Sequence, residues 1–144
     1  MTYSPLLGPI VALVAWTLVM LTWMAATRML AMKKAGIDIT KRVGGRGQSL
    51  EGVLPDEVNW KSHNYTHLME QPTLFYAITI VLVLIEQNSP INVWLAWGYV
   101  AFRIVHSIVQ STINQVKYRF PLFAVSTLCL VGLTVHAGAA LLHR

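Results

Sequence analysis

Residues 87–116 read QNSPINVWLAWGYVAFRIVHSIVQSTINQV and contain one formally charged side chain, that of Arg103. The charge-free runs on either side of it, residues 87–102 and 104–116, have 16 and 13 residues. Because a helix needs about 20 residues to cross the bilayer core, neither run can cross it alone, and Arg103 must lie inside a span. A charge buried there costs about 3 kcal/mol even on the lowest scales and usually faces a partner, a cavity or a ligand. Arg103 is therefore the first functional candidate.

The composition agrees with a membrane protein, since 55% of the 144 residues are hydrophobic and 12% are charged. These values exclude an ordinary soluble domain. Several spans in a chain of this length leave no room for a second domain, so we expect residues 1–144 to form a single one. A small bundle often needs neighbouring copies to bury its polar residues, which favours an oligomer.

Hydropathy predicts four spans, at about residues 6–32, 64–86, 91–114 and 119–142, with a polar loop at about 33–63. The second span has a charge-free run of only 15 residues, 71–85, so it must extend back through Glu70. We therefore expect Glu70 to lie within the bundle. The predicted fold is an all-α membrane protein, a bundle of four transmembrane helices.

The basic residues indicate how the chain is oriented in the membrane. Both termini and the turn at residues 86–90 have almost none, Arg144 being the exception. Two connections are rich in basic residues: the first carries Lys33, Lys34, Lys41, Arg42, Arg46 and Lys61, and the second carries Lys117 and Arg119. By the positive-inside rule these two connections face the cytoplasm, and both termini lie on the opposite side.

Two polar stripes follow helical spacing within the predicted spans. The residues of the first, on the third span, are Tyr99, Arg103, His106, Gln110 and Asn114, at steps of four, three, four and four. On the second span His63, His67 and Glu70 recur at steps of four and three. Residues at these spacings share one helix face, so we expect the two stripes to meet inside the bundle. Arg28 and Arg119, at the same membrane side, can join them.

A structural interpretation of the stripes stays open beside a functional one. Glu70 and Arg103 can pair simply to neutralise each other, and the remaining polar residues can be hydrogen bonds between helices. Against this, Arg28, Arg103 and Arg119 are three cations near one carboxylate, and an anionic ligand would compensate the surplus. His63, His67 and Glu70 could also bind a metal ion, but there is only one such box. We expect no metal, and no surface for nucleic acid is evident.

Particular motifs then resemble a known family. Residues 63–75, HNYTHLMEQPTLF, and residues 99–106, YVAFRIVH, followed by Arg119, resemble the second helix, third helix and start of the fourth helix in the MAPEG superfamily. These are the membrane-associated proteins in eicosanoid and glutathione metabolism. The resemblance covers nearly the whole chain and is closest to bacterial-type microsomal glutathione transferases.

The resemblance implies a homotrimer that binds glutathione, as a co-substrate, between subunits near the cytoplasmic side. Glu70 and Arg103 match the carboxylate and arginine that engage the polar ends of glutathione, and His106 matches their neighbour. Arg119 matches the arginine that stabilises the glutathione thiolate and is the catalytic candidate. Arg28 matches an arginine contributed across the subunit interface.

The expected function is a membrane-bound glutathione transferase or peroxidase that acts on apolar electrophiles or lipid peroxides. His67 and Gln110 complete the expected glutathione-binding set because they lie on the same stripes. Three positions depart from the family pattern: Gln110 and Phe123 stand where some catalytic members have tyrosine, and His67 replaces a common asparagine. These departures argue against prostaglandin E synthase activity. They leave a second hypothesis, a non-catalytic trimer that binds lipid or acts as a scaffold.

Overall fold

The computed structural model describes residues 3–41 and 43–143, so Arg42 and Arg144, counted above among the basic residues, lie outside it. The described residues contain four long helices, two short 3₁₀ turns and no strand, which confirms the predicted all-α fold. The helices are α1 (Leu7–Lys34), α2 (Asp56–Leu84), α3 (Pro90–Thr112) and α4 (Val116–Leu142), and the turns are η1 (Ile39–Lys41) and η2 (Gly47–Leu50).

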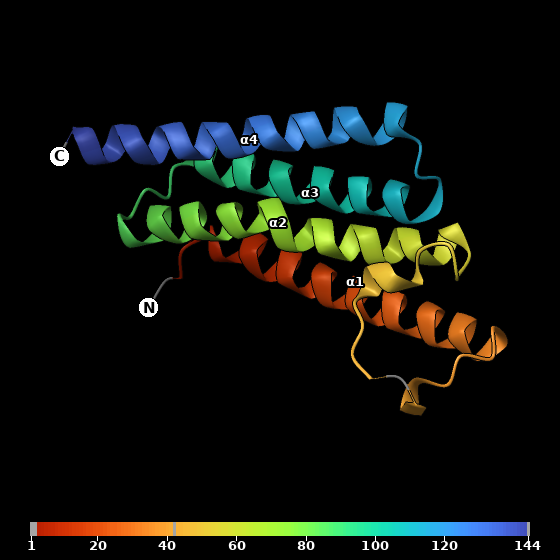
Figure 1. The fold of residues 1–144 in the computed structure, drawn as a ribbon. Helices are drawn as coiled ribbons and strands as arrows, with labels where there is room; N and C mark the ends of the chain where they lie inside the picture. Colours follow the sequence, from red (N-terminus) through yellow and green to blue (C-terminus); the bar gives the residue numbers. More distant parts are fainter. Residues whose placement is uncertain (1–2, 42, 144) are drawn as a thin grey trace.

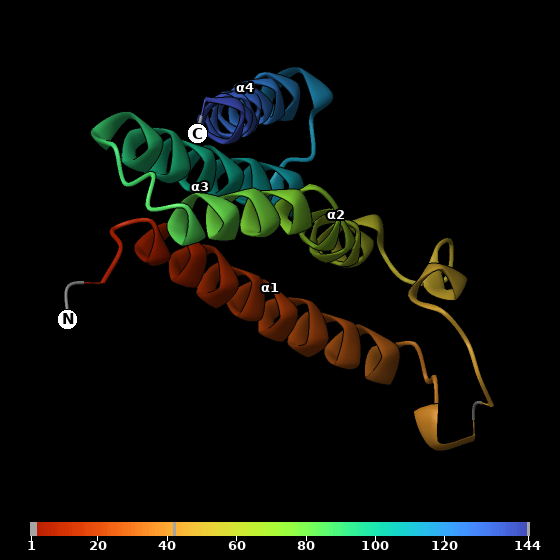
Figure 2. The same ribbon diagram turned by 90° about the vertical axis from the view of Figure 1, so that its left-hand side faces the viewer.

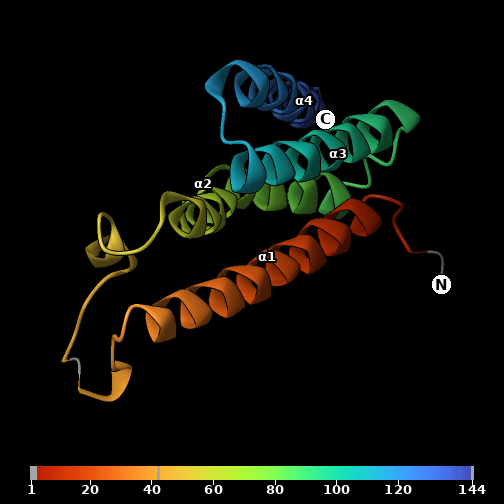
Figure 3. The same cartoon turned by 90° about the vertical axis from the view of Figure 1, so that its right-hand side faces the viewer.

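The helices lie side by side in chain order, with α1 and α4 at opposite edges (Figure 1). α2 and α3 lie between them, and α4 packs mainly on α3 while α1 packs mainly on α2 (Figures 2 and 3). The connections α1–α2 and α3–α4 lie at one end of the bundle, and the termini and the α2–α3 turn lie at the other (Figure 1). The two connections with basic residues are therefore at the same end.

Local sequence explains where the helices begin. At α3 the Ser89 hydroxyl accepts a hydrogen bond from the Asn92 backbone N–H at 3.3 Å, and Pro90 occupies the first turn, where its missing N–H costs nothing. α2 begins with Asp56 and Glu57, whose charges favour a helix N-terminus. This polar start lies inside the stretch predicted as loop, so α2 extends well beyond the predicted span at residues 64–86.

α2 also changes direction near its middle (Figure 2). Pro72 lies inside the helix there, and its ring has no N–H to donate to the carbonyl four residues earlier.

The apolar core fills the half of the bundle nearer the termini. At its centre the rings of Phe75 and Tyr99 stack with centroids 4.3 Å apart and planes inclined by 9°. The other buried members of this core are Leu6, Leu13, Leu82, Ala96, Val100, Leu130, Leu133 and Ala137. The polar residues of α2 and α3 occupy the other half, so the core and the polar region occupy different depths of the bundle.

The outer surface carries many large apolar side chains, among them Leu18 on α1 and Leu128 on α4. Among the described residues, three helices are long and apolar enough to cross a membrane: α1, α2 and α4. α3 has 23 residues, but its polar face includes Arg103, His106 and Gln110, which lower its mean hydropathy.

The Phe75–Tyr99 stack predicts a local packing defect on truncation. Phe75→Ala leaves a cavity beside a fully buried ring, and the loss of packing should lower the free energy of unfolding by about 3 kcal/mol. Leu74→Ala is the matched control, because Leu74 is 61% exposed on the neighbouring position of the same helix. Thermal unfolding in detergent should show a lower Tm for Phe75→Ala alone. Equal Tm values for the two variants would contradict the described core.

Candidate functional site

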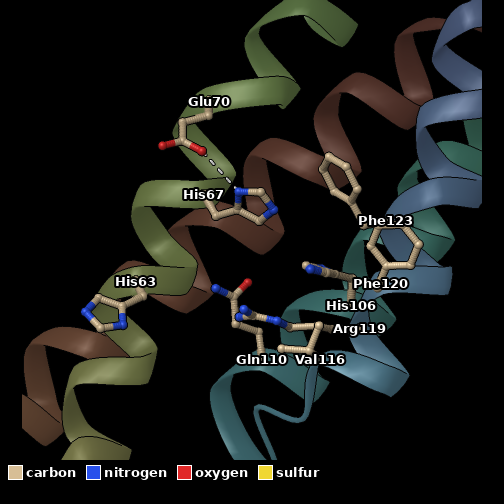
Figure 4. A pocket seen from close by; sticks show the side chains of 9 residues that line it. All are labelled: His63, His67, Glu70, His106, Gln110, Val116, Arg119, Phe120 and Phe123. Atoms are coloured by element: carbon tan, nitrogen blue, oxygen red, sulfur yellow. Dashed lines mark hydrogen bonds and ion pairs between the residues drawn. The ribbon is translucent and has the colours of Figure 1, made fainter.

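A cavity of about 350 Å³ opens between α2, α3 and α4 (Figure 4). It lies toward the end of the bundle where α3 connects to α4, since Val116 and Arg119 at the start of α4 line it. Its lining residues are His63, His67 and Glu70 from α2, His106 and Gln110 from α3, and Val116, Arg119, Phe120 and Phe123 from α4. Five of the seven candidate site residues, His67, Glu70, His106, Gln110 and Arg119, thus lie together around one cavity. We refer to it as the α2–α4 cavity.

Arg103 lies just behind the lining of this cavity and is almost fully buried, with 1% of its surface exposed. Its Nε donates to the Tyr99 hydroxyl at 3.3 Å, and its Nη1 donates to Nε2 of His67 at 3.4 Å. The guanidinium carbon also lies 5.3 Å from the ring centre of Phe123, a distance at which a cation is attracted by the ring face. Nη2 is buried and has no partner among the described residues.

Glu70 lies at the mouth of the cavity. Its carboxylate accepts a hydrogen bond from Nδ1 of His67 at 3.1 Å (Figure 4), and its side chain is 63% exposed. The expectation that Glu70 lies within the bundle is therefore wrong for a single subunit, because its position on α2 turns it away from α3. No salt bridge joins Glu70 to Arg103: His67 lies between them and contacts both.

Polar contacts join α2 to α3 at four successive levels. The pairs are Lys61 with the Ser111 backbone carbonyl, Asn64 with Ser107, His67 with Arg103, and Gln71 with Tyr99, at 3.2, 2.6, 3.4 and 3.4 Å. The two predicted stripes thus meet only in part: His67 contacts Arg103, whereas His63 bonds Glu51 and Glu70 bonds His67. Ser107 is a contact that the sequence analysis missed, and its spacing of four residues after Arg103 was the available signal. We call these pairs the α2–α3 ladder.

Arg119 reaches the cavity because of the tight turn between α3 and α4. Asn114 adopts a left-handed conformation with φ of 53°, which asparagine tolerates better than most residues, and ends α3. Its side-chain Oδ1 accepts a hydrogen bond from Nη1 of Arg119 at 2.8 Å. Asn114 was predicted as a stripe member. In the structure it forms the turn and holds the Arg119 guanidinium.

Two buried polar atoms of α3 face the site without a partner. His106 is 4% exposed and Gln110 is 6% exposed, and neither His106 Nε2 nor Gln110 Oε1 has a hydrogen bond among the described residues. The His106 ring lies edge-on to His67, with centroids 5.2 Å apart. Buried polar groups without partners are costly, so these atoms mark a place where a ligand, water or another chain would bind favourably.

Arg28 does not reach the cavity of its own subunit. Its Nη2 donates to the Gly47 carbonyl at 3.0 Å, which attaches η2 to α1. The expectation that Arg28 joins the two polar stripes together with Arg119 is wrong within one chain, because Arg28 bonds η2 and because α2 and α3 separate α1 from α4 (Figure 2).

The histidine box on α2 does not assemble as a metal site. His63 Nε2 bonds Glu51 Oε1 at 2.8 Å, while both ring nitrogens of His67 are occupied by Glu70 and Arg103. Across residues 3–41 and 43–143, no group of three or more His, Cys, Asp or Glu side chains is placed to hold a metal ion. Glu51 was not among the predicted residues, since nothing in the loop sequence indicates which carboxylate returns to α2.

Comparison with known proteins agrees with the motifs. The model of the MAPEG family matches residues 6–139, almost the entire chain. Searches of curated proteins and of solved structures found no significant match. Together with the three apolar helices, the family match identifies an integral membrane protein. The four-helix chain belongs to the MAPEG family.

Proposed function

We propose that this protein binds glutathione in the α2–α4 cavity and activates its thiol for transfer to apolar electrophiles or for reduction of lipid peroxides. The observation that carries the proposal is the composition of the cavity. It brings the Arg119 cation together with buried, unpartnered atoms of His106 and Gln110, beside an exposed carboxylate at the mouth. A ligand with two carboxylates, an ammonium group and a thiol would satisfy such a set.

The charges suggest how glutathione would be oriented. Glu70 would receive the ammonium group, because its carboxylate is accessible and turned outward. Arg103 retains one buried unpartnered nitrogen, Nη2, which can donate to a ligand carboxylate. Arg119 would lie nearest the sulfur, since a guanidinium favours a thiolate over a thiol, and the thiolate is the attacking species.

Apolar side chains form the α4 side of the cavity and support an apolar co-substrate. Phe120 is 63% exposed, and Val116 and Phe123 line the cavity beside it. An electrophile dissolved in the membrane could approach the sulfur along this side. The thiolate would form a carbon–sulfur bond as the leaving group departs. With a peroxide it would form a sulfur–oxygen bond as the O–O bond breaks, the alkoxide would take a proton, and a second glutathione thiol would displace the hydroxyl from sulfur as water to give glutathione disulfide.

Arg119 is the residue that most directly tests the mechanism. In Arg119→Leu, the bound thiol should ionise at higher pH, and conjugation of model electrophiles should fall roughly 100-fold because the charge opposite the sulfur is lost. Glutathione affinity should change less, since Arg103 keeps its position. Lys117→Leu is the matched control: it removes one positive charge from the same helical turn, outside the cavity lining.

The measurement is a titration of purified protein with glutathione, followed by the ultraviolet absorbance of the thiolate and by conjugation rates. Arg119→Lys should recover only part of the rate, since lysine keeps the charge and loses the planar fork. The alternative is a non-catalytic trimer that binds lipid or acts as a scaffold. It would be favoured if the wild-type protein forms no thiolate, conjugates none of a broad panel of electrophiles, and copurifies with lipid.

A homotrimer is proposed as the working assembly. Its support is that Glu70 is exposed in one subunit and that Arg28 cannot reach the cavity of its own chain, so a neighbouring copy would have to bring Arg28 to the site. Native mass spectrometry in detergent should show three copies. A stable monomer that binds glutathione with full affinity would contradict this proposal.

The proposed membrane placement has four spans, because α3 crosses the membrane in addition to α1, α2 and α4. Its 23 residues give about 35 Å of helix, enough to cross the hydrocarbon core beside α2 and α4. The two basic connections would face the cytoplasm, and both termini would lie on the opposite side. A reporter fused to the C-terminus should behave as non-cytoplasmic, with a reporter inserted at residues 43–46 as the opposite control. A cytoplasmic signal from the C-terminus would contradict the placement.

A further inference from the structure

We propose that His67 is a positioning residue that fixes the Glu70 carboxylate relative to the Arg103 guanidinium, so that both ends of glutathione meet a preset site. This inference rests on the proposed glutathione binding and assigns His67 a role through its neighbours rather than through ligand contact. Its basis is that His67 lies between the two groups, 3.1 Å from Glu70 and 3.4 Å from Arg103.

The hydrogen-bond partners determine which ring nitrogen of His67 carries the proton. An arginine can only donate, so Nε2 of His67 must accept from Arg103. Nε2 therefore has no hydrogen, and Nδ1 carries the hydrogen that is donated to Glu70. His67 must be neutral to make both contacts, because an imidazolium would present a donor to the donor on Arg103.

The ring of His67 is held in place by its surroundings. It stacks on Phe123 with centroids 5.5 Å apart and planes inclined by 27°, and it meets the edge of His106 at 5.2 Å. Arg103 on its far side is 1% exposed. Because its ring is held against buried groups, His67 can hold the exposed Glu70 carboxylate in one position.

Glu70 depends on this contact for its orientation. Among the described residues, His67 makes the only hydrogen bond or ion pair to the Glu70 carboxylate. A side chain with 63% exposure would otherwise sample several rotamers, and a carboxylate that must be ordered on binding loses affinity. His67 thus removes part of that cost before the ligand arrives.

The test compares two substitutions in the full-length, detergent-solubilised protein. His67→Leu removes both contacts and should weaken glutathione binding about tenfold at pH about 7.5, which corresponds to roughly one hydrogen bond to a charged group. His67→Asn keeps a donor for Glu70 and an acceptor for Arg103, so its affinity should stay near wild type. His143→Asn, at the opposite end of the bundle, is the control and should keep the wild-type affinity.

A double-mutant cycle separates positioning from general stability. If His67 acts through Glu70, the losses in glutathione affinity for His67→Leu and Glu70→Gln should not add in the double variant. Additive losses, unchanged affinity in His67→Leu, or a loss in His67→Asn as large as that in His67→Leu would each overturn the role of His67. Failure of the wild-type protein to bind glutathione at any pH would instead overturn the proposed function. Nitrogen NMR of histidine-labelled protein without glutathione would still test the Nδ1–H form directly, and finding the hydrogen on Nε2 would refute it.

Discussion

Burial of the Arg103 guanidinium among membrane-crossing helices is the constraint on which the rest of the structure depends. A group that stays charged at all accessible pH values must find acceptors or aromatic faces where water is scarce. Here Tyr99 and His67 accept two of its hydrogen bonds, and the ring of Phe123 faces its charge. These three partners come from α3, α2 and α4, so the need to solvate one cation brings three helices together.

The α2–α3 ladder provides hydrogen-bond partners for other polar groups along the same helix interface. Each level pairs a polar side chain of α2 with a polar group of α3 inside the bundle, while His63 and Glu70 of the α2 stripe stay exposed in one subunit. The stacked rings of Phe75 and Tyr99 continue the interface as an apolar core toward the termini. Tyr99 belongs to both regions, since its ring packs in the core while its hydroxyl accepts from Arg103.

The α2–α4 cavity forms where this interface opens toward the basic connections. Its positive charge comes from Arg119, held by Asn114 at the turn, and its negative charge comes from Glu70 at the mouth. His67 links the mouth to the buried Arg103. One subunit leaves Glu70 exposed and leaves buried atoms of His106 and Gln110 without partners, which is the pattern of a site that another molecule completes.

Much of this could be predicted from sequence because it depends on local spacing. The lengths of the charge-free runs placed Arg103 inside a helix, and steps of three and four residues placed Tyr99, His106 and Gln110 on its face, where all are buried. Motif spacing likewise identified the family and most residues of the cavity. These properties follow from the pitch of a helix and the thickness of a bilayer, which act on each segment separately.

Other features were decided only by how the helices pack. The order of the helices across the bundle placed Arg28 away from Arg119, and the rotation of α2 about its axis put Glu70 outside while His67 faces inward. The φ of Asn114 turned a predicted stripe member into a support for Arg119. Periodicity tells which residues share a face, but not which neighbour that face meets or at what depth. The neighbour and the depth depend on the packing and hydrogen bonding of several helices together, and the sequence of one helix does not contain that information.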